Sequence, residues 1–408
     1  MEQTSLRPRS KRMTSVDLPF LVAVLLLLAI GLATLYSAGF AKALQETGNS
    51  YHYILRQGAF ALVGLVGMIV ISFFPYKLYK KIAVPFYGVC MVLLVAVLLL
   101  SKDTERRWLY LGGFQFQPSE FAKVAVILFL ALYLSNEKLR VRKFWKGIVI
   151  PSCIFGLCAG LVGIEPHLSG AILIAGVGLV MIVAAGANVM QMLPIGIAAV
   201  IGGVALYLSK EYMQLRVATW LNPELDPSNA GYQALQSFYA IGSGGLTGVG
   251  FGESRQKYLY LPEPQNDFIF SVFCEEMGWI AAVVVLGLFA FVVVRGLYIA
   301  TKAPDKFSSL IVVGIITRLA VQTLFNVAVV SGAFPVTGIS LPFFSYGGTA
   351  LIVLLGEMGI VLQISRYADI ERDPPPKLSR RKEGGEEEIS DIPTEKTNRK
   401  RKPIEKRG

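Results

Sequence analysis

The stretch LPEPQNDFIFSVFCEEMG, residues 261–278, joins acidic side chains to the start of a long apolar run. Asp267, Glu275 and Glu276 lie at the entrance to that run, although charge is rare in the chain's other apolar segments. A carboxylate beside apolar surroundings can have its pKa raised into a range that is useful for proton transfer. We therefore predict that this stretch carries an acid–base group.

Further charged residues lie beside or within apolar runs, where each needs a partner or a polar cavity. They are Lys102, Arg106 and Arg107 before one run, Glu120 and Lys123 within it, Glu165 after the next, and Arg318 in a later one. Glu120 and Lys123 are three residues apart on one helical face, so a self-neutralising pair and a functional role are both open. Arg318 starts a polar stripe that continues with Gln322 and Asn326 at four-residue spacing.

Both signs of charge at one membrane edge suit an amphipathic anionic ligand. A lipid pyrophosphate is such a ligand, with arginines for its phosphates, a carboxylate for proton transfer and an apolar groove for its tail. A transporter that carries charged residues in broken helices is an alternative. For the three outer basic residues, a solvated loop is the plainer interpretation.

The sequence contains no recognisable metal or dinucleotide motif. The four cysteines lie in or beside apolar runs without CxxC spacing, and His167 has no companion ligands at metal-binding spacing. The glycine-rich stretch GSGGLTGVGFGES does not follow GxGxxG, because Thr247 stands where the third glycine is due. A phosphate-binding nest and a flexible hinge are both open for it, and the hinge is the simpler interpretation.

The elements that must position these residues are membrane-spanning helices. The chain of 408 residues is 54% hydrophobic and only 16% charged, whereas soluble domains carry about 25% charged residues. Apolar runs of about 20 residues, enough to cross a bilayer, recur along it. We expect an all-α polytopic membrane protein with ten transmembrane helices. The predicted spans are residues 18–37, 57–74, 82–100, 118–134, 147–164, 170–187, 191–208, 268–294, 308–332 and 347–365.

Lysine and arginine residues predict the orientation of these spans. They concentrate in the N-terminal tail, in the second-to-third, fourth-to-fifth and eighth-to-ninth connections, and in the C-terminal tail. With ten spans these segments share one side, which the positive-inside rule makes the cytoplasm, so both termini are expected there. The net charge of +11 then reflects topology and contact with inner-leaflet membrane lipids, and it does not indicate nucleic-acid binding.

The predicted organisation has three parts. Residues 1–16 form a basic cytoplasmic tail, residues 17–367 form the ten-helix domain, and residues 368–408 form a charged cytoplasmic tail that is expected to be disordered. Residues 209–267 form a large extracytoplasmic loop between helices 7 and 8. Two short helices are expected within it, at KEYMQLRVATWL and GYQALQSFYAI.

Long motifs between Asp17 and Tyr367 resemble the SEDS family (shape, elongation, division, sporulation). They are RRWLYLGGFQFQPSEFAK, EPHLSGAI, WLNPELDPSNAGYQALQSFYAIGSGGLTGVGFGESRQKYLYLPEPQNDFIF, CEEMG and NVAVVSGAFPVTGISLPFFSYGGTALI. The ending LQISRY and the RRW stretch are closer to the FtsW and SpoVE branches than to RodA. The resemblance implies ten transmembrane helices and polymerisation of lipid II into glycan strands outside the membrane.

The resemblance also implies roles for particular residues. Asp267 falls on the essential acid of the family's PExxxDF motif, which implies a general base, or a group that orients the acceptor hydroxyl, with undecaprenyl pyrophosphate as leaving group. Glu120 and Lys123 match a charged pair that lines the central cavity. Arg107, with Trp108, matches an outer-loop RW motif that is expected to contact pyrophosphate.

The chain departs from many members of the family where Gln265-Asn266 replaces a His-Thr pair. Proton transfer through that histidine cannot operate here, although Gln265 can still hydrogen-bond a sugar. The complete candidate site comprises catalytic Asp267 and the substrate-binding residues Arg106, Arg107, Glu120, Lys123, Glu165, Gln265, Glu275, Glu276 and Arg318.

Three functions are open at this point. They are a peptidoglycan glycosyltransferase, a lipid II flippase whose path is lined by Glu120, Lys123 and Arg318, and a non-catalytic divisome scaffold. The resemblance favours the glycosyltransferase, in the bacterial cytoplasmic membrane at the division septum, with lipid II as substrate. It implies a class B penicillin-binding protein transpeptidase and divisome proteins as partners. The residues predict no metal site and no certain cofactor, and a requirement for a divalent cation, Mg²⁺ or Mn²⁺, stays open.

Overall fold

The computed structural model describes residues 15–100, 107–111, 114–136, 143–165, 167–226 and 230–368. Its α-helices are α1 (Leu18–Thr47), α2 (His52–Phe73), α3 (Lys77–Leu100), α4 (Pro118–Ser135), α6 (Ile150–Ile164), α7 (Leu168–Ala184), α8 (Leu193–Ser209), α9 (Glu211–Leu221), α10 (Ala230–Ser243), α11 (Ile269–Thr301), α12 (Lys306–Val330) and α13 (Gly348–Ser365). Shorter helical turns are η1 (Phe144–Val149), η2 (Val189–Met192) and η3 (Pro223–Leu225). The strands β1 (Leu109–Leu111) and β2 (Phe114–Phe116) pair antiparallel, a small addition to the all-α fold expected from the sequence.

Each predicted span overlaps one helical segment. Within the described residues, nine helices are long and apolar enough to cross a membrane, and the predicted span 170–187 corresponds to α7, a shorter apolar helix of 17 residues. Helices α1 and α11 continue beyond their predicted ends, to 30 and 33 residues. The ten-crossing topology stays a prediction, and the predicted tails lie almost entirely outside the described residues.

Polar residues between the apolar runs fix where helices begin. Asp17 caps α1 by accepting a hydrogen bond from the Phe20 backbone N–H at 3.0 Å, and its carboxylate also pairs with Arg295 of α11 at 2.8 Å. Asp305 and Ser308 form a capping box at the start of α12. These caps satisfy backbone N–H groups that a helix start leaves without partners.

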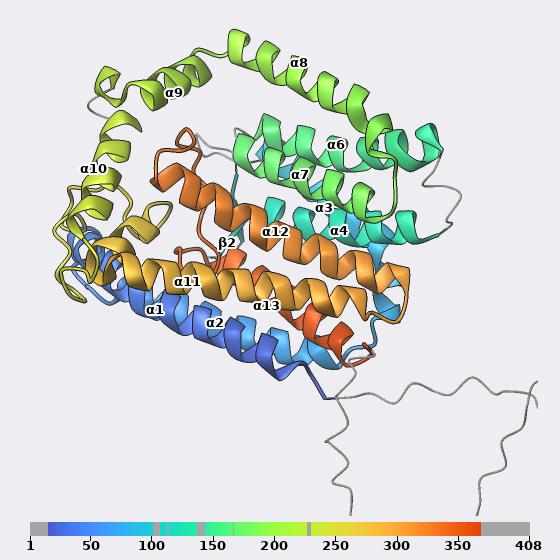
Figure 1. Ribbon diagram of the computed structural model, residues 1–408, viewed down its shortest axis with the longest axis horizontal. Coiled ribbons are helices and arrows are strands. Elements are labelled where there is room, and N and C mark those ends of the chain that lie inside the picture. Colours follow the sequence, from blue (N-terminus) through green and yellow to red (C-terminus); the bar gives the residue numbers. More distant parts are fainter. Residues whose placement is uncertain are drawn as a thin grey trace, which may run out of the picture. The chain divides into compact units, whose positions relative to one another are not determined.

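Three helices form the centre of the bundle. In the most apolar 18-residue windows of α4 and α13, 72% of the residues are buried, and in α12 61%, against 22% in α2 and α3. Figure 1 shows α12 between α7 and α11, both of which it contacts. Four charged residues of α4, α12 and α13 therefore lie inside the protein, namely Glu120, Lys123, Arg318 and Glu357.

Close helix packing depends on glycine where α2 meets α13. A Cβ atom added at Gly359 would lie 2.7 Å from the Met68 carbonyl oxygen, a separation that real Cβ contacts do not reach. Small residues at such positions allow two helix backbones to approach each other in a membrane. This pair helps to form one wall of the cavity described below.

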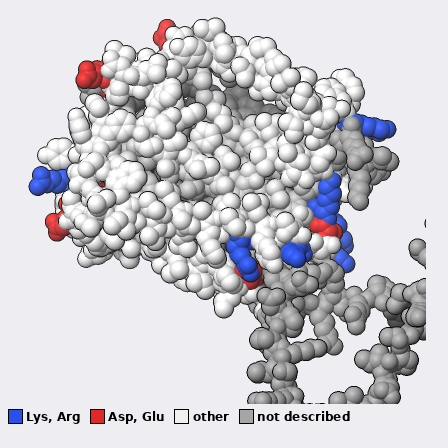
Figure 2. Space-filling view, in the orientation of Figure 1, with Lys and Arg blue, Asp and Glu red and all other residues white. Residues whose placement is uncertain are grey.

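The face shown in Figure 2 has the charge distribution of a membrane protein. Lys, Arg, Asp and Glu side chains lie toward the ends of the helices, and the surface between them is almost free of charge. An uncharged belt of this kind is what contact with lipid requires.

The long polar segment after α8 contains the two short helices predicted for it. Helix α9 coincides with KEYMQLRVATWL, η3 follows at the proline-containing break, and α10 covers GYQALQSFYAI. Trp220 of α9 donates its indole N–H to the Gly332 carbonyl at 2.8 Å. This contact ties the segment to the loop between α12 and α13.

Candidate active site

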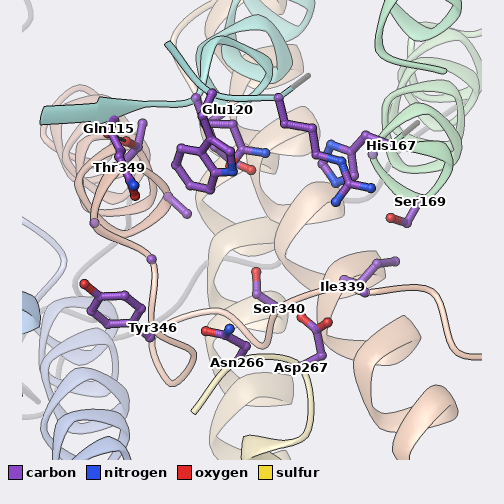
Figure 3. A pocket seen from close by; sticks show the side chains of 18 of the residues that line it. Gln115, Glu120, His167, Ser169, Asn266, Asp267, Ile339, Ser340, Tyr346 and Thr349 are labelled. Atoms are coloured by element: carbon purple, nitrogen blue, oxygen red, sulfur yellow. Dashed lines mark hydrogen bonds between the residues drawn. The ribbon is translucent and has the colours of Figure 1, made fainter. Parts of the chain in front are cut away.

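One large cavity brings together residues that are far apart in the sequence. Its volume is about 730 Å³, within the range of about 300–1,000 Å³ that is typical of ligand sites. Figure 3 shows side chains from several elements converging on it. Its charged or titratable lining residues are Arg56, Arg107, Glu120, Lys123, His167, Glu263, Asp267 and Tyr346.

Asp267 lines this cavity and lies shortly before the start of α11 at Ile269. Three hydrogen bonds fix the backbone around it. Asn326 of α12 donates its side-chain amide to the Asp267 carbonyl at 2.8 Å and to the Ile339 carbonyl at 2.7 Å. The Ser345 hydroxyl donates to the Asn266 carbonyl at 2.7 Å. The polar stripe predicted on this helix therefore includes a residue that holds the acidic segment against the loop before α13.

Gly338 lies beside the Asp267 side chain. Its φ is +71°, a left-handed conformation, and an added Cβ would be in ordinary contact with Asp267 Oδ2 at 3.4 Å. Glycine adopts this backbone without strain. The loop before α13 can therefore pass beside the carboxylate, which points into the cavity in Figure 3.

A chain of alternating charges lies at the buried end of the cavity. Lys123 Nζ is 2.6 Å from Glu120 Oε1, and Arg318 Nη1 is 3.4 Å from Glu120 Oε2. Arg318 Nη2 in turn is 2.6 Å from Glu357 Oε2. All four residues are at most 6% exposed, so each charge depends on its neighbours for compensation.

The network separates the predicted residues into two groups. Glu120 and Lys123 line the cavity, whereas Arg318 lies beneath it, beside two small pockets of about 10 and 30 Å³. Arg318 is a second partner of Glu120, in addition to Lys123. Glu357 was absent from the predicted site, because its partner lies 39 residues away in the sequence, on another helix.

Arg107 lies near two titratable residues at the junction of α6 and α7. Burial raises the pKa of Glu165 to about 8, and Arg107 opposes this rise. Burial lowers the pKa of His167 to about 3, with further lowering by Lys123 and Arg107. Both side chains are therefore neutral at pH 7.

Arg107 and His167 line the cavity, whereas Glu165 is fully buried behind it. Neither Glu165 carboxylate oxygen has a hydrogen-bond partner among the described residues. Arg106 lies outside the described residues, so its predicted role remains a prediction.

Gln265 does not line the cavity. Its side chain is 1% exposed and donates to Glu263 Oε2 at 2.9 Å, and Asn266 donates to the same oxygen at 2.8 Å. Glu263 itself has a positive φ of 51° and lines the cavity. Gln265 and Asn266 thus hold the loop through Glu263. Because Gln265 does not line the cavity, its position gives no support for a direct contact with a sugar.

Glu275 and Glu276 also lie outside the cavity, where they hold the glycine-rich loop. Glu275 accepts hydrogen bonds from the Ser254 hydroxyl and from the Arg255 backbone N–H, the latter at 3.1 Å. Glu276 pairs with the buried Lys257 at 2.9 Å. Both acids therefore hold the loop. Neither lines the cavity, where the substrate contacts predicted for them would form.

The glycine-rich loop docks on a break in α11. Gly278 has φ +76° and ψ 179°, which interrupts the helical hydrogen bonds. The backbone of residues 245–250 supplies replacements. These bonds run from Val249 N–H to Glu275 O at 3.0 Å, from Gly250 N–H to Glu276 O at 3.0 Å, and from Trp279 N–H to Gly245 O at 3.0 Å.

The glycines make this docking sterically possible. An added Cβ would lie 2.1 Å from the Cys274 carbonyl oxygen at Gly244, and 2.1 Å from the Glu276 carbonyl oxygen at Gly248. The interpretation of this stretch as a flexible hinge is therefore wrong. Its glycines serve close backbone approach, which the sequence also allowed.

Four charged or titratable residues that line the cavity were absent from the predicted site, namely Arg56, His167, Glu263 and Tyr346. Arg56 and Tyr346 line the cavity together, from α2 and from the loop before α13. Arg56 stands near the start of a span, where a basic residue also fits a membrane flank. Its link to Tyr346 crosses about two-thirds of the chain, and nothing in the local sequence signals it.

The described residues contain no group of three His, Cys, Asp or Glu side chains that could hold a metal ion. A requirement for Mg²⁺ or Mn²⁺ remains open.

Comparisons with known proteins agree with the fold. The profile of a family described as a cell cycle protein, comprising FtsW, RodA and SpoVE, matches residues 18–370. Stage V sporulation protein E of Bacillus subtilis (strain 168) is 40% identical over 359 residues, covering 87% of this chain and 98% of the relative. The probable peptidoglycan glycosyltransferase FtsW of Trichlorobacter lovleyi is 38% identical over 358 residues, covering 87% of this chain and 94% of the relative.

Solved structures share the architecture. A chain from a study described as "Structural coordination of polymerization and crosslinking by a peptidoglycan synthase complex" superposes with a TM-score of 0.72 at 28% identity, covering 86% of this chain and 98% of that one. The crystal structure of Thermus thermophilus rod shape determining protein RodA gives a TM-score of 0.65 at 28% identity, covering 87% and 98%. The chain therefore belongs to the FtsW, RodA and SpoVE family, which is the SEDS family that its motifs resemble.

Proposed function

We propose that this protein is a peptidoglycan glycosyltransferase that polymerises lipid II at the outer face of the cytoplasmic membrane. The observation that carries the proposal is the shared cavity, in which Asp267 lies with Arg107, Lys123 and Arg56. A carboxylate for proton transfer and cations for pyrophosphate are the groups that glycosyl transfer from a lipid pyrophosphate needs. The FtsW relatives named as probable peptidoglycan glycosyltransferases support the same activity.

In the proposed step one bond forms, one bond breaks and one proton is transferred. The acceptor hydroxyl oxygen attacks the anomeric carbon of the donor, and a new glycosidic C–O bond forms. The donor's bond to pyrophosphate breaks, and its electron pair stays on the pyrophosphate oxygen. The hydroxyl proton passes to the Asp267 carboxylate, while Arg107 and Lys123 stabilise the charge that develops on the leaving group.

The buried network favours this enzyme over a flippase on the same scaffold. A transbilayer path for lipid II would have to pass Glu120, Lys123 and Arg318, which pair with one another and fill the buried end of the cavity. Opening that end would separate buried ion pairs, at a cost of about 3–5 kcal/mol for each partner left alone. Polymerisation needs no path past this network, because both substrates can enter and leave by the open end of the cavity.

Partners and location follow from the same proposal. Glycan strands need crosslinking, so we propose a class B penicillin-binding protein as the partner transpeptidase. The structural match to a complex that coordinates polymerisation and crosslinking supports this assignment. The FtsW and SpoVE relatives support a role in division or sporulation, with the septum as the proposed site of action.

Purified protein incubated with labelled lipid II in detergent separates the candidate functions. Glycan polymer formed without any bilayer is the expected result. A protein that makes no polymer in detergent, alone or with its transpeptidase, yet moves lipid II across vesicle membranes, would establish the flippase. Activity in neither assay would leave the scaffold role.

A further inference from the structure

The proposed reaction joins two substrates that each carry a lipid pyrophosphate. The donor loses its pyrophosphate in the reaction, whereas the acceptor keeps its own throughout. Both groups sit at the membrane edge when the acceptor hydroxyl meets the donor's anomeric carbon. If the proposed function is correct, the cavity must therefore bind two pyrophosphates at once.

Cationic side chains line the cavity in two separate places. Arg107 and Lys123 line the cavity together with His167, and both lower the pKa of that residue. Arg56 instead interacts with Tyr346, whose pKa is raised by burial and lowered by the nearby guanidinium. Figure 3 shows His167 and Tyr346 on opposite sides of the cavity, so the two cationic places face each other across it.

The two places differ in burial. Lys123 is 5% exposed and Arg107 is half-buried, whereas Arg56 is exposed. Interactions with charge are stronger where water is excluded. The His167 side is therefore suited to stabilise negative charge that develops on a leaving group during the reaction. The Arg56 side is suited to bind a pyrophosphate whose charge does not change.

The start of α13 adds to the Arg56 side. Gly347, Gly348 and Thr349 line the cavity, and the N-cap residue, Gly347, has no side chain to cap the helix. A helix start carries partial positive charge on its first N–H groups. This charge supplements the guanidinium of Arg56 and does not replace it.

We propose that Arg56 and Tyr346 form the subsite for the acceptor's pyrophosphate, and that Arg107 and Lys123 form the subsite for the donor's. The donor's breaking bond adjoins its pyrophosphate, so that group must lie close to Asp267 and in the drier part of the cavity. The acceptor's reacting hydroxyl is a disaccharide away from its pyrophosphate, which fits the exposed mouth. In the view of Figure 3, Asp267 lies toward the His167 side, as this assignment requires.

Two lipid II analogues with single roles test the assignment. A donor-only analogue has the terminal hydroxyl of its disaccharide capped by an extra sugar. An acceptor-only analogue has a methylene group in place of the bridging anomeric oxygen, so its pyrophosphate cannot leave. Coupling of the two gives one product, a lipid-linked tetrasaccharide with its capping sugar, and KM can be measured for each analogue separately with the purified full-length protein.

Arg56→Gln is expected to raise KM for the acceptor-only analogue at least tenfold and to change KM for the donor-only analogue less than twofold. Arg107→Gln is expected to show the reverse pattern and also to lower kcat. Arg255→Gln is the matched control, because Arg255 is an exposed arginine on the outer loop that does not line the cavity. This control is expected to leave both KM values unchanged.

Other outcomes would overturn the assignment. Equal effects of Arg56→Gln on both analogues, an effect on the donor alone, or no effect would each contradict an acceptor subsite. If Arg56→Gln does not fold, Arg56→Lys provides the test, with a smaller rise confined to the acceptor's KM. A wild-type protein that makes no coupled product would overturn the proposed function, whereas normal coupling with unchanged KM values would overturn the subsites alone.

Discussion

At the scale of single residues, the site combines one well-anchored carboxylate with charges of different burial. Asp267 is fixed through its backbone by Asn326, and Gly338 lies beside its side chain. Exchange of the carboxylate for an amide is expected to keep this backbone contact. Activity and stability can therefore be separated at this position.

Glu165 is a second acid whose burial makes a measurable prediction. Its pKa rises from an ordinary value of 4.5 to about 8 because it is buried. The unfolded chain then loses the proton near pH 4.5, whereas the folded protein keeps it until about pH 8. Stability is therefore lost as the pH rises through this window.

Glu165→Gln removes this dependence, because an amide does not titrate. The variant is expected to match the wild type in thermal stability near pH 4.5 and to exceed it increasingly up to pH 8. The largest difference in the free energy of unfolding between the variant and the wild type is about 1.4 kcal/mol for each unit of pKa shift. Thermal unfolding in detergent at several pH values measures the difference, and a difference that does not change with pH would contradict the buried neutral acid.

The pair Glu120 and Lys123 gives a prediction about partners. Exchanging them (Glu120→Lys with Lys123→Glu) preserves their mutual attraction but places a lysine beside Arg318, which lies 3.4 Å from the present carboxylate. The exchanged protein is therefore expected to remain inactive in lipid II polymerisation and to be less stable than the wild type. Expression level and thermal stability serve as controls for folding, and restored activity would return the pair to a self-contained structural role.

At the scale of secondary-structure elements, the break in α11 and the glycine-rich loop form one unit. The loop restores hydrogen bonds that the conformation of Gly278 removes, and Glu275 and Glu276 hold it through side-chain contacts. The segment that carries Asp267 follows this loop in the chain.

Two nearby glycines, Gly242 and Gly244, allow the close packing of the loop to be distinguished from the general flexibility of glycine. An added Cβ at Gly244 would lie 2.1 Å from the Cys274 carbonyl, whereas at Gly242, within α10, it meets nothing within 4 Å. Gly244→Ala is expected to cost about 1–3 kcal/mol through overpacking. Gly242→Ala is expected to raise stability by about 0.5–1 kcal/mol, because alanine favours a helix interior over glycine.

Thermal unfolding of both variants in the same detergent tests this difference in sign. The Gly244→Ala protein should unfold at a lower temperature than the wild type and the Gly242→Ala protein at a slightly higher one. Equal small effects from the two substitutions would show that the loop does not pack closely against α11.

At the scale of the whole molecule, hydropathy predicted most of the architecture. Every predicted span overlaps a helical segment, because long apolar runs have few alternatives to a helix in a bilayer. Helix ends were less accurate, since helices α1 and α11 extend beyond the apolar part of their sequence. The C-cap of helix α1 is Gly48, which has a left-handed conformation, and that of α11 is Lys302. Neither end coincides with the end of the apolar run.

The site was only partly predictable for a physical reason. Asp267, Glu120, Lys123 and Arg107 stand out because charge beside apolar sequence is costly, and all four line the cavity. The same rule also selected Glu275 and Glu276, since a buried structural acid and a substrate-binding acid look alike in one sequence. Arg56 was missed because its neighbour Tyr346 is distant in the chain.

The central claim is that Asp267 takes the proton in glycan polymerisation. Its most direct test compares glycan polymer formed from labelled lipid II in detergent by purified wild type and by Asp267→Asn. The account predicts at least a hundredfold loss of rate, in the range expected for removal of a general base, with unchanged thermal stability. Glu253→Gln, an exposed acid on the outer loop, should retain full activity as the control. Polymerisation by Asp267→Asn at a rate near that of the wild type would contradict the account.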